Sequence, residues 1–218
     1  MRAAALSVAC FAAVTVAVQL GAFGGLDQWS IDHVMPWVAP ESHSQPLLSG
    51  LLPFTRHTPG SEIPAEIWLY PASVPISLLA TAGCCAYLWR RGLGLAALAW
   101  ASAWILGNAV EVIGKEAVRR PTPHVGLVHM PAFDDSFPSG HAIRALLLVA
   151  LLTAVRPRLR LPAAAWLAIA LPLLVVTNAH LPSDVIGAVF LGCGMSLVCA
   201  HMSRDASRIG AVASAGSS

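Results

Sequence analysis

Six long apolar stretches, separated by polar and proline-rich segments, dominate the hydropathy pattern of this chain. They lie at about 3–24, 66–89, 93–114, 140–156, 161–179 and 183–202. Each approaches the roughly 20 residues that a helix needs to cross a bilayer. The pattern therefore predicts an all-α, polytopic membrane protein, with six transmembrane helices in one bundle formed by residues 1–203.

Three regions of the chain, namely the first apolar stretch, residues 25–65 and residues 204–218, do not follow directly from the helix pattern. Residues 25–65 form a long connection with tryptophans and several prolines, which fits an interfacial cap with aromatic anchors, or else a lid or lipid gate. Residues 204–218 are small and polar, which predicts a disordered tail. The first apolar stretch follows Arg2 as a secretory signal would, but its length and the lack of a clear Ala-x-Ala site favour a retained helix.

Composition agrees with a membrane protein. Of the 218 residues, 56% are hydrophobic and 11% charged, whereas soluble domains carry about 25% charge. The net charge of +2 is too small to indicate nucleic-acid binding. All five cysteines fall inside apolar stretches without a C-x-x-C pair, so we interpret them as small core residues rather than disulfide or metal ligands.

The basic residues indicate an orientation. If the N-terminus is inside, eight of the thirteen basic residues lie at cytoplasmic ends, and most of the acids lie in the outer connections. This distribution follows the positive-inside rule. We therefore expect a multi-pass protein of the cell membrane with both termini cytoplasmic.

Two polar boundaries at the ends of apolar stretches carry the candidate chemistry, and both would face outward. One is Pro138-Ser139-Gly140-His141, and the other holds His180 and Asp184, 39 residues after His141. Ionisable groups at membrane depth are costly and usually functional. A carboxylate paired with one imidazole nitrogen would fix the tautomer and raise the basicity of the other nitrogen, as a nucleophilic histidine requires.

The neighbouring residues suit a phosphate site. A helix that begins near Ser139 offers unpaired N–H groups and a positive dipole end, and Gly140 would allow close approach of an anion. Lys115, which is the only lysine, and Arg119 and Arg120 could supply positive charge to phosphate oxygens.

With these residues, the chain resembles the membrane-bound type-2 phosphatidic-acid phosphatases, which share their site with acid phosphatases and vanadium haloperoxidases. That family has three motifs: Lys, six residues, then Arg-Pro; Pro-Ser-Gly-His; and Ser-Arg, five residues, His, three residues, Asp. The resemblance covers about 93–200 by motif. It implies removal of phosphate from lipid or polyprenyl phosphates through a phosphohistidine, without metal or other cofactor.

The resemblance also implies roles for individual residues. His180 matches the nucleophile, Asp184 its orienting carboxylate, and His141 the general acid. The phosphate-binding positions that match are Lys115, Ser139 and Gly140.

Both family arginines are absent from their expected places, which hold Thr122 and Leu174. Loss of one transition-state donor typically costs about 10²–10³ in rate. Arg120, which precedes Pro121, and Arg144, on the same helical face as His141, are the candidate replacements.

Both arginines also have a possible role that does not involve phosphate. Arg120 could be a solvated loop charge, and Arg144 could form a structural pair with Asp134 or Asp135. Glu111 lies one helical turn before Lys115. We expect it to form a buried ion pair with Lys115 or Arg144, or else to adjust the electrostatics of the site.

Other functions also have to be weighed. The missing arginines favour, as the alternative, a weakened or inactive family member that binds lipid phosphates or acts as a membrane assembly partner. A transporter or channel lacks support because we find no repeat or broken-helix pair. His124 and His129, with the two motif histidines, could suggest a metal cluster, but no metal-binding spacing such as H-E-x-x-H supports it. The lipid itself stays open, although the missing arginines point toward a monophosphate rather than a diphosphate.

Overall fold

The computed structural model describes residues 1–35, 67–121, 123–125, 128–130 and 133–215, with side chains up to residue 205. The helices are α1 (Arg2–Gln19), α2 (Gly24–His33), α3 (Val74–Arg90), α4 (Gly94–Ala117), α5 (Gly140–Val155), α6 (Arg160–Val176) and α7 (Pro182–Ala215). Short 3-10 turns lie at Tyr70–Ala72 and Pro157–Leu159, and β1 (His124–Val125) pairs antiparallel with β2 (Val128–His129).

Each of the six apolar stretches contains one helix, as the hydropathy pattern predicts. Four segments in the described chain are long and apolar enough to cross a membrane: Arg2–Gln19, Gly94–Ala117, Pro157–Val176 and Pro182–Asp205. α5 is shorter, about 24 Å at 1.5 Å per residue. Its packing against α3, α4, α6 and α7 gives it protein neighbours in place of lipid. A helical protein with four potential spans is thus established, and the six-span bundle stays a prediction.

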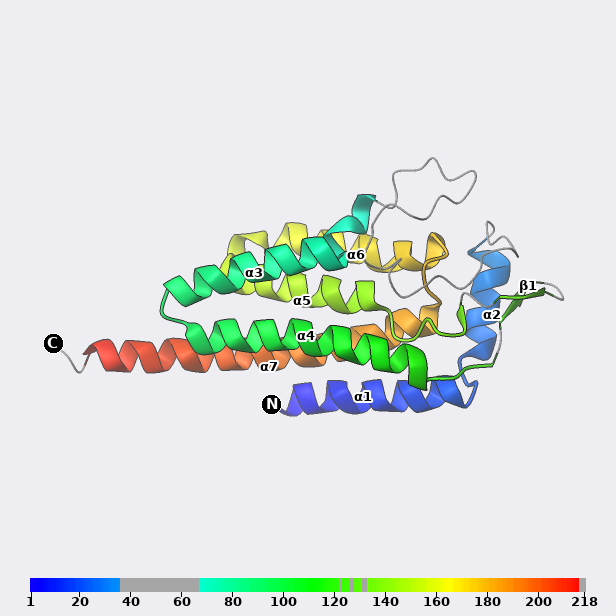
Figure 1. Cartoon of the computed structure of the whole chain (residues 1–218), viewed down its shortest axis with the longest axis horizontal. Coiled ribbons are helices and arrows are strands. Elements are labelled where there is room, and N and C mark those ends of the chain that lie inside the picture. The colour runs from blue at the N-terminus through cyan, green and yellow to red at the C-terminus, as the bar shows by residue number, and fades with distance from the viewer. Residues whose placement is uncertain (36–66, 122, 126–127, 131–132, 216–218) are drawn as a thin grey trace.

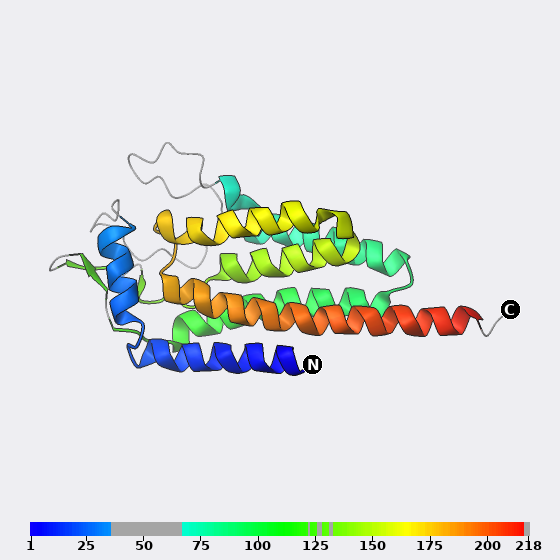
Figure 2. The same cartoon turned by 180° about the vertical axis from the view of Figure 1, so that it is seen from behind.

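The helices form an elongated bundle. α1 and α3–α7 run side by side along the long axis, and α2 lies across one end (Figures 1 and 2). α7 is central, because it packs against α1, α4 and α5. The main core combines Trp100 of α4, Leu151 of α5, Leu174 of α6 and Leu191 of α7. This core therefore joins residues that are far apart in the sequence, along the length of the bundle.

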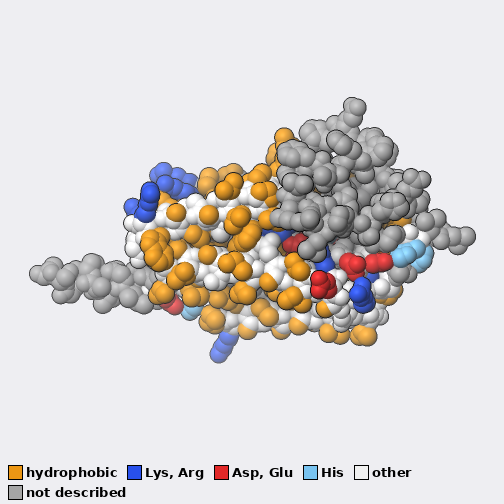
Figure 3. Space-filling model, viewed as in Figure 1, with side chains coloured by type: hydrophobic (Ala, Val, Ile, Leu, Met, Phe, Trp, Pro, Cys, Tyr) orange, Lys and Arg blue, Asp and Glu red, His pale blue; other side chains and the backbone are white. Residues whose placement is uncertain are grey.

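The outer surface of the bundle is apolar. In the view of Figure 3, hydrophobic side chains cover the helices between the two ends, and charged side chains gather toward the ends. Leu79 and Leu161 are 73% and 84% exposed, which would be unfavourable in water but suits contact with lipid. The arginine-bearing turns after α3 and α5, the start of α1 and the end of α7 lie away from α2 (Figure 1). The side of the membrane that each end faces stays a prediction.

Two segments differ from expectation. α2 begins at the start of the predicted 25–65 connection. Residues 36–65 of that connection lie outside the described chain, so cap and lid both stay predictions. α7 continues to Ala215, which corrects the expectation of a disordered tail for 204–215. The physical reason is that adding a residue to an existing helix costs little compared with starting one.

Candidate active site

His180 lies in the short connection between α6 and α7, at the end of the bundle that α2 covers. After α6 ends, Asn178 adopts a left-handed conformation with φ 59°, which asparagine tolerates better than most residues. The N–H groups of Ala179 and His180 then donate to the carbonyl of Leu174, at 3.0 and 2.9 Å. This turn holds the His180 side chain in a buried position.

Asp184 lies in the first turn of α7 and is fully buried. Its Oδ2 accepts the N–H of Leu181 at 3.0 Å and lies 3.4 Å from Nδ1 of His180. Its Oδ1 accepts a hydrogen bond from Arg120. The 3.4 Å contact is longer than an ordinary hydrogen bond, as is common for catalytic pairs without substrate. The expected pairing of imidazole with carboxylate is therefore present as a close contact.

Burial also sets the protonation of His180. It lowers the pKa of this imidazole below its usual range, and the neighbouring Asp184 carboxylate only partly offsets the shift. The neutral imidazole is thus favoured near pH 7, and only the neutral form has a lone pair available for attack.

The Pro-Ser-Gly-His segment begins α5, as expected. Ser139 is the N-cap, and its Oγ accepts the N–H of Ala142 at 3.3 Å. The N–H of Ser139 donates to the backbone carbonyl of Asp184 at 3.2 Å, which ties the two polar boundaries together. The ring centroids of His141 and His180 are 6.3 Å apart. Two histidines from distant parts of the sequence therefore share one site.

Glu111 binds two of the basic side chains proposed for phosphate. Its carboxylate accepts hydrogen bonds from Lys115 Nζ at 2.7 Å and from Arg144 Nη1 at 2.5 Å. Arg144 also donates to Asn108 Oδ1 at 2.9 Å and to the carbonyl of Ala72 at 2.8 Å. The side chain of Arg144 is 3% exposed, whereas that of Lys115 is 30% exposed. The predicted ion pair of Glu111 is confirmed, and it involves both cations.

Position 140 has to be glycine because the carboxylate of Glu111 occupies the space where a Cβ atom would lie. A Cβ atom at Gly140 would lie 1.8–2.0 Å from the carboxylate atoms of Glu111, far inside van der Waals contact. We expected glycine here to admit an anion. In the structure, the anion that approaches this backbone is the protein's own Glu111.

Arg120 is held by two further acids. Its Nη2 donates to Asp184, and its Nη1 lies 3.5 Å from Asp27 Oδ2 and 3.2 Å from Ser183 Oγ. Asp27 in turn accepts the N–H and the hydroxyl of Ser183, at 3.1 and 2.7 Å. Burial raises the pKa of Asp27, whereas its hydrogen bonds with Ser183 and the charge of Arg120 lower it. This guanidinium is 3% exposed and belongs to a buried acid–base cluster.

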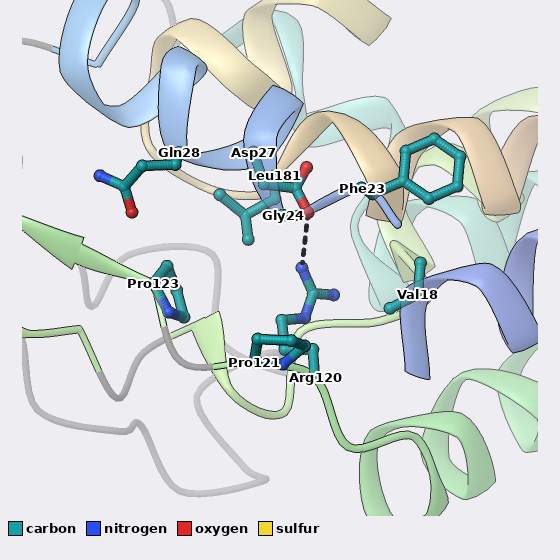
Figure 4. A pocket seen from close by; sticks show the side chains of 9 residues that line it. All are labelled: Val18, Phe23, Gly24, Asp27, Gln28, Arg120, Pro121, Pro123 and Leu181. Carbon is teal, nitrogen blue, oxygen red and sulfur yellow. Dashed lines mark hydrogen bonds and ion pairs between the residues drawn. The ribbon is translucent and has the colours of Figure 1, made fainter. Parts of the chain in front are cut away.

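A small cavity of about 120 Å³ lies beside this cluster. Figure 4 shows Arg120 and Asp27 joined across it, with α1, α2 and the segment after α4 around them. Neither His141 nor His180 lines this cavity. Besides Arg120 and Asp27, its lining is mostly apolar and consists of Val18, Phe23, Gly24, Gln28, Pro121, Pro123 and Leu181.

Residues 95–208, just over half of the chain, match the family model of the PAP2 superfamily. The chain belongs to the PAP2 superfamily. The matched region runs from α4 into α7 and includes Lys115, the Pro-Ser-Gly-His segment, His180 and Asp184. No curated protein and no solved structure matches the sequence. Membership in this superfamily supports a phosphatase-type function.

The two departures from the PAP2 motifs have structural counterparts. Leu174, at the place of the third-motif arginine, is 1% exposed and packs in the main core. Thr122, at the place of the first-motif arginine, lies outside the described residues. Arg120 and Arg144 do lie near the site, but their guanidinium groups bond to acids of the protein.

Several candidate residues lie elsewhere. His124 and His129 face each other across β1 and β2, with ring centroids 5.8 Å apart. The expectation that Asp134 or Asp135 pairs with Arg144 is wrong, because these acids bind His129 and Arg119 at the surface. Asp134 and Asp135 are close to Arg144 in the sequence, but the turn before α5 separates their side chains from it.

Sequence reasoning missed Asp27. It lies in α2, outside the stretch that matches the PAP2 superfamily, and the charge pattern alone places it among the acids of the outer connections. Its one available signal was an acid between apolar neighbours, Phe23, Leu26 and Trp29, in a segment that would otherwise pass for a loop.

Proposed function

We propose that this PAP2 protein removes phosphate from a lipid or polyprenyl phosphate through a phosphohistidine on His180. The observation that carries the proposal is the buried His180 imidazole, in contact with Asp184 on one side and facing His141 on the other. This arrangement combines a neutral nucleophile, a carboxylate that orients it and a second imidazole for proton transfer.

In the proposed reaction, Nε2 of His180 attacks phosphorus in line with the lipid oxygen. The P–O bond to the lipid breaks, and the leaving oxygen takes a proton from His141. Water then attacks the phosphohistidine, gives a proton to His141, and breaks the P–N bond to release inorganic phosphate. Asp184 would hold Nδ1–H of His180 throughout, so that Nε2 keeps its lone pair.

Phosphate binding would use groups at the two helix ends. The Ser139 hydroxyl and the Gly140 amide lie at the N-terminus of α5, where the helix dipole favours an anion. Among Lys115, Arg120 and Arg144, Lys115 is the most exposed, and it has two further N–H donors. Arg144 would take part by sharing its charge between Glu111 and the phosphate.

The substrate class follows from the surroundings of the site. The bundle presents apolar side chains to its exterior, and the site lies at one end (Figures 1 and 3). A lipid could keep its apolar part in the bilayer and bring only its phosphate to the site. From the charge distribution we propose that this end meets the outer leaflet of the cell membrane.

The test is phosphate release from diacyl and polyprenyl phosphates by the full-length protein in detergent. We expect His180→Ala to abolish turnover. A matched control exists at the other end of α7, where His201 and Asp205 repeat the same spacing at 3.3 Å but are about half exposed. His201→Ala should act as wild type. Equal activity of His180→Ala and wild type would refute the mechanism, and loss of activity in a chelator would refute its metal independence.

A second function has one specific observation in its favour. Arg120 and Arg144 both bond to acids of the protein, and Leu174 replaces a family arginine, so transition-state stabilisation would be weak. The protein would then bind lipid phosphates, or help a membrane assembly, without turning them over. Lipid-phosphate binding without phosphate release, in wild type and His180→Ala alike, would favour this function.

A further inference from the structure

The cluster of Asp27, Arg120 and Ser183 connects α2 with the N-terminus of α7. Asp27 accepts two hydrogen bonds from Ser183, and Arg120 reaches Ser183, Asp27 and Asp184. His180 contacts the opposite oxygen of the Asp184 carboxylate. Arg120 therefore lies on the far side of Asp184 from the imidazole.

We propose that Arg120 and Asp27 are positioning residues that keep Asp184 ionised and turned toward His180, and that Arg120 is not a ligand of the phosphate. The proposal rests on the proposed function for its effect on rate, but its structural part can be tested without turnover.

Charge balance supports this assignment. Asp184 is fully buried, and a buried carboxylate stays ionised only when a cation or strong donors compensate it. Arg120 is the cation in contact with it. Its Nε has no hydrogen-bond partner among the described residues, so its described bonds all go to Asp184, Asp27 and Ser183. Two acids around one guanidinium leave no excess positive charge there for a phosphate dianion.

The consequence for His180 concerns its tautomer. An ionised Asp184 accepts Nδ1–H and leaves the lone pair on Nε2, which faces the proposed substrate. Without Arg120, Asp184 would gain a proton and donate it to Nδ1. The imidazole would then carry its own hydrogen on Nε2, where it could not attack phosphorus.

Asp27 adds a connection to α2. Because it holds both Ser183 and Arg120, it fixes the first turn of α7 relative to the guanidinium. α2 lies outside the PAP2 match, so this chain uses a segment beyond the matched region to support its site.

Turnover and phosphate binding separate the two possible roles of Arg120. In Arg120→Gln we expect kcat to fall by about 100-fold or more, as when a catalytic imidazole has the wrong tautomer. Asp27→Asn should lower kcat about tenfold, typical of a group that orients a reactive side chain. Binding of inorganic phosphate, followed by ³¹P NMR titration of the full-length protein in detergent, should change less than about threefold in both variants.

The control is Asp32→Asn, an exposed acid of the same helix, which among the described residues accepts a hydrogen bond from Gln28 alone. It should act as wild type. If Arg120 were a phosphate ligand, Arg120→Gln would weaken phosphate binding about 10- to 100-fold, and the proposal would be wrong. If the Gln variant does not fold, Arg120→Lys gives a second test. It keeps the charge beside Asp184, so kcat should fall less than about tenfold and phosphate binding should change less than about threefold, whereas replacing a guanidinium that binds phosphate would weaken phosphate binding about tenfold or more.

The tautomer of His180 provides the readout that does not need activity. ¹⁵N NMR of histidine-labelled protein, with His180→Asn to assign the signal, should show Nδ1–H in wild type and a shift toward Nε2–H in Arg120→Gln. An unchanged His180 signal would overturn the positioning role. A wild type that releases no phosphate but shows these tautomers would instead overturn only the proposed function.

Discussion

Replacing Glu111 by Gln would remove the negative charge that two cations share. The carboxylate contacts Arg144 at 2.5 Å and Lys115 at 2.7 Å. The substitution keeps the shape and one oxygen, so its main effect is electrostatic. Among the described residues, Arg144 would be left as a buried cation with neutral acceptors alone: Asn108, the carbonyl of Ala72 and the remaining amide oxygen at position 111.

The magnitude follows from burial. Removing one partner of a buried ion pair costs about 3–5 kcal/mol, because the other charge is left uncompensated. Arg144 is 3% exposed and meets this condition, whereas Lys115 at 30% can turn to water. Since Arg144 keeps two acceptors, we expect the lower value, about 3 kcal/mol. For a chain of this size, that corresponds to a Tm lower by roughly 6–12 °C.

The assay is thermal unfolding of the full-length protein in one detergent, followed by intrinsic fluorescence. Asp135→Asn is the matched control, because the Arg119–Asp135 pair has a similar length, 2.9 Å, but is 76% and 54% exposed. Exposed pairs contribute about 0–1 kcal/mol, so this variant should unfold near wild type. Adding Arg144→Met to Glu111→Gln should restore most of the loss. Equal Tm values for Glu111→Gln and Asp135→Asn would refute the reasoning.

Three further predictions concern the site. Because burial lowers the pKa of His180 and the neutral form attacks, kcat/KM should fall with acid through a midpoint below about 6.5; a midpoint above that value in the pH profile would contradict this. His141→Ala should slow lipid phosphate hydrolysis by about 10²–10⁴. With an activated aryl phosphate, whose leaving group needs no proton, the first burst of released phenol should keep its rate although later turnover slows. A burst slowed as much as lipid phosphate hydrolysis would exclude a general acid. Gly140→Ala should lower the Tm through its clash with Glu111, and the loss should shrink in a Glu111→Ala background; additive effects in the four-variant cycle would argue against the contact.

Much of the fold could be predicted because hydropathy is a local property. Each apolar stretch became a helix, and Ser139 begins α5 as expected. The spacing of His180 and Asp184 was also informative, because the turn that leads into α7 keeps the two side chains close, with Nδ1 3.4 Å from Oδ2. Helix α2 was not predicted, because it is short and its mixed composition resembles that of a loop.

The partners of the charged side chains could not be predicted from spacing alone. Arg144 was expected to meet Asp134 or Asp135, which are close in sequence, but it pairs with Glu111 on α4. Likewise, Arg120 was considered as a phosphate ligand, and its bonds go to Asp27 and Asp184. Buried charges need counter-charges, and which acid provides one depends on helix packing.

The sequence by itself determined the helices of the six apolar stretches, the apolar exterior and the superfamily motifs, because hydrophobic runs and short motifs are properties of neighbouring residues. Tertiary structure alone decided that His141 and His180 face each other, that Glu111 occupies the space beside Gly140, and that Asp27 reaches Arg120 from α2. The physical reason is that such contacts join residues 29 to 93 positions apart in the sequence. Only the packing of α2, α4, α5 and α7 at one end of the bundle brings them within a few ångströms.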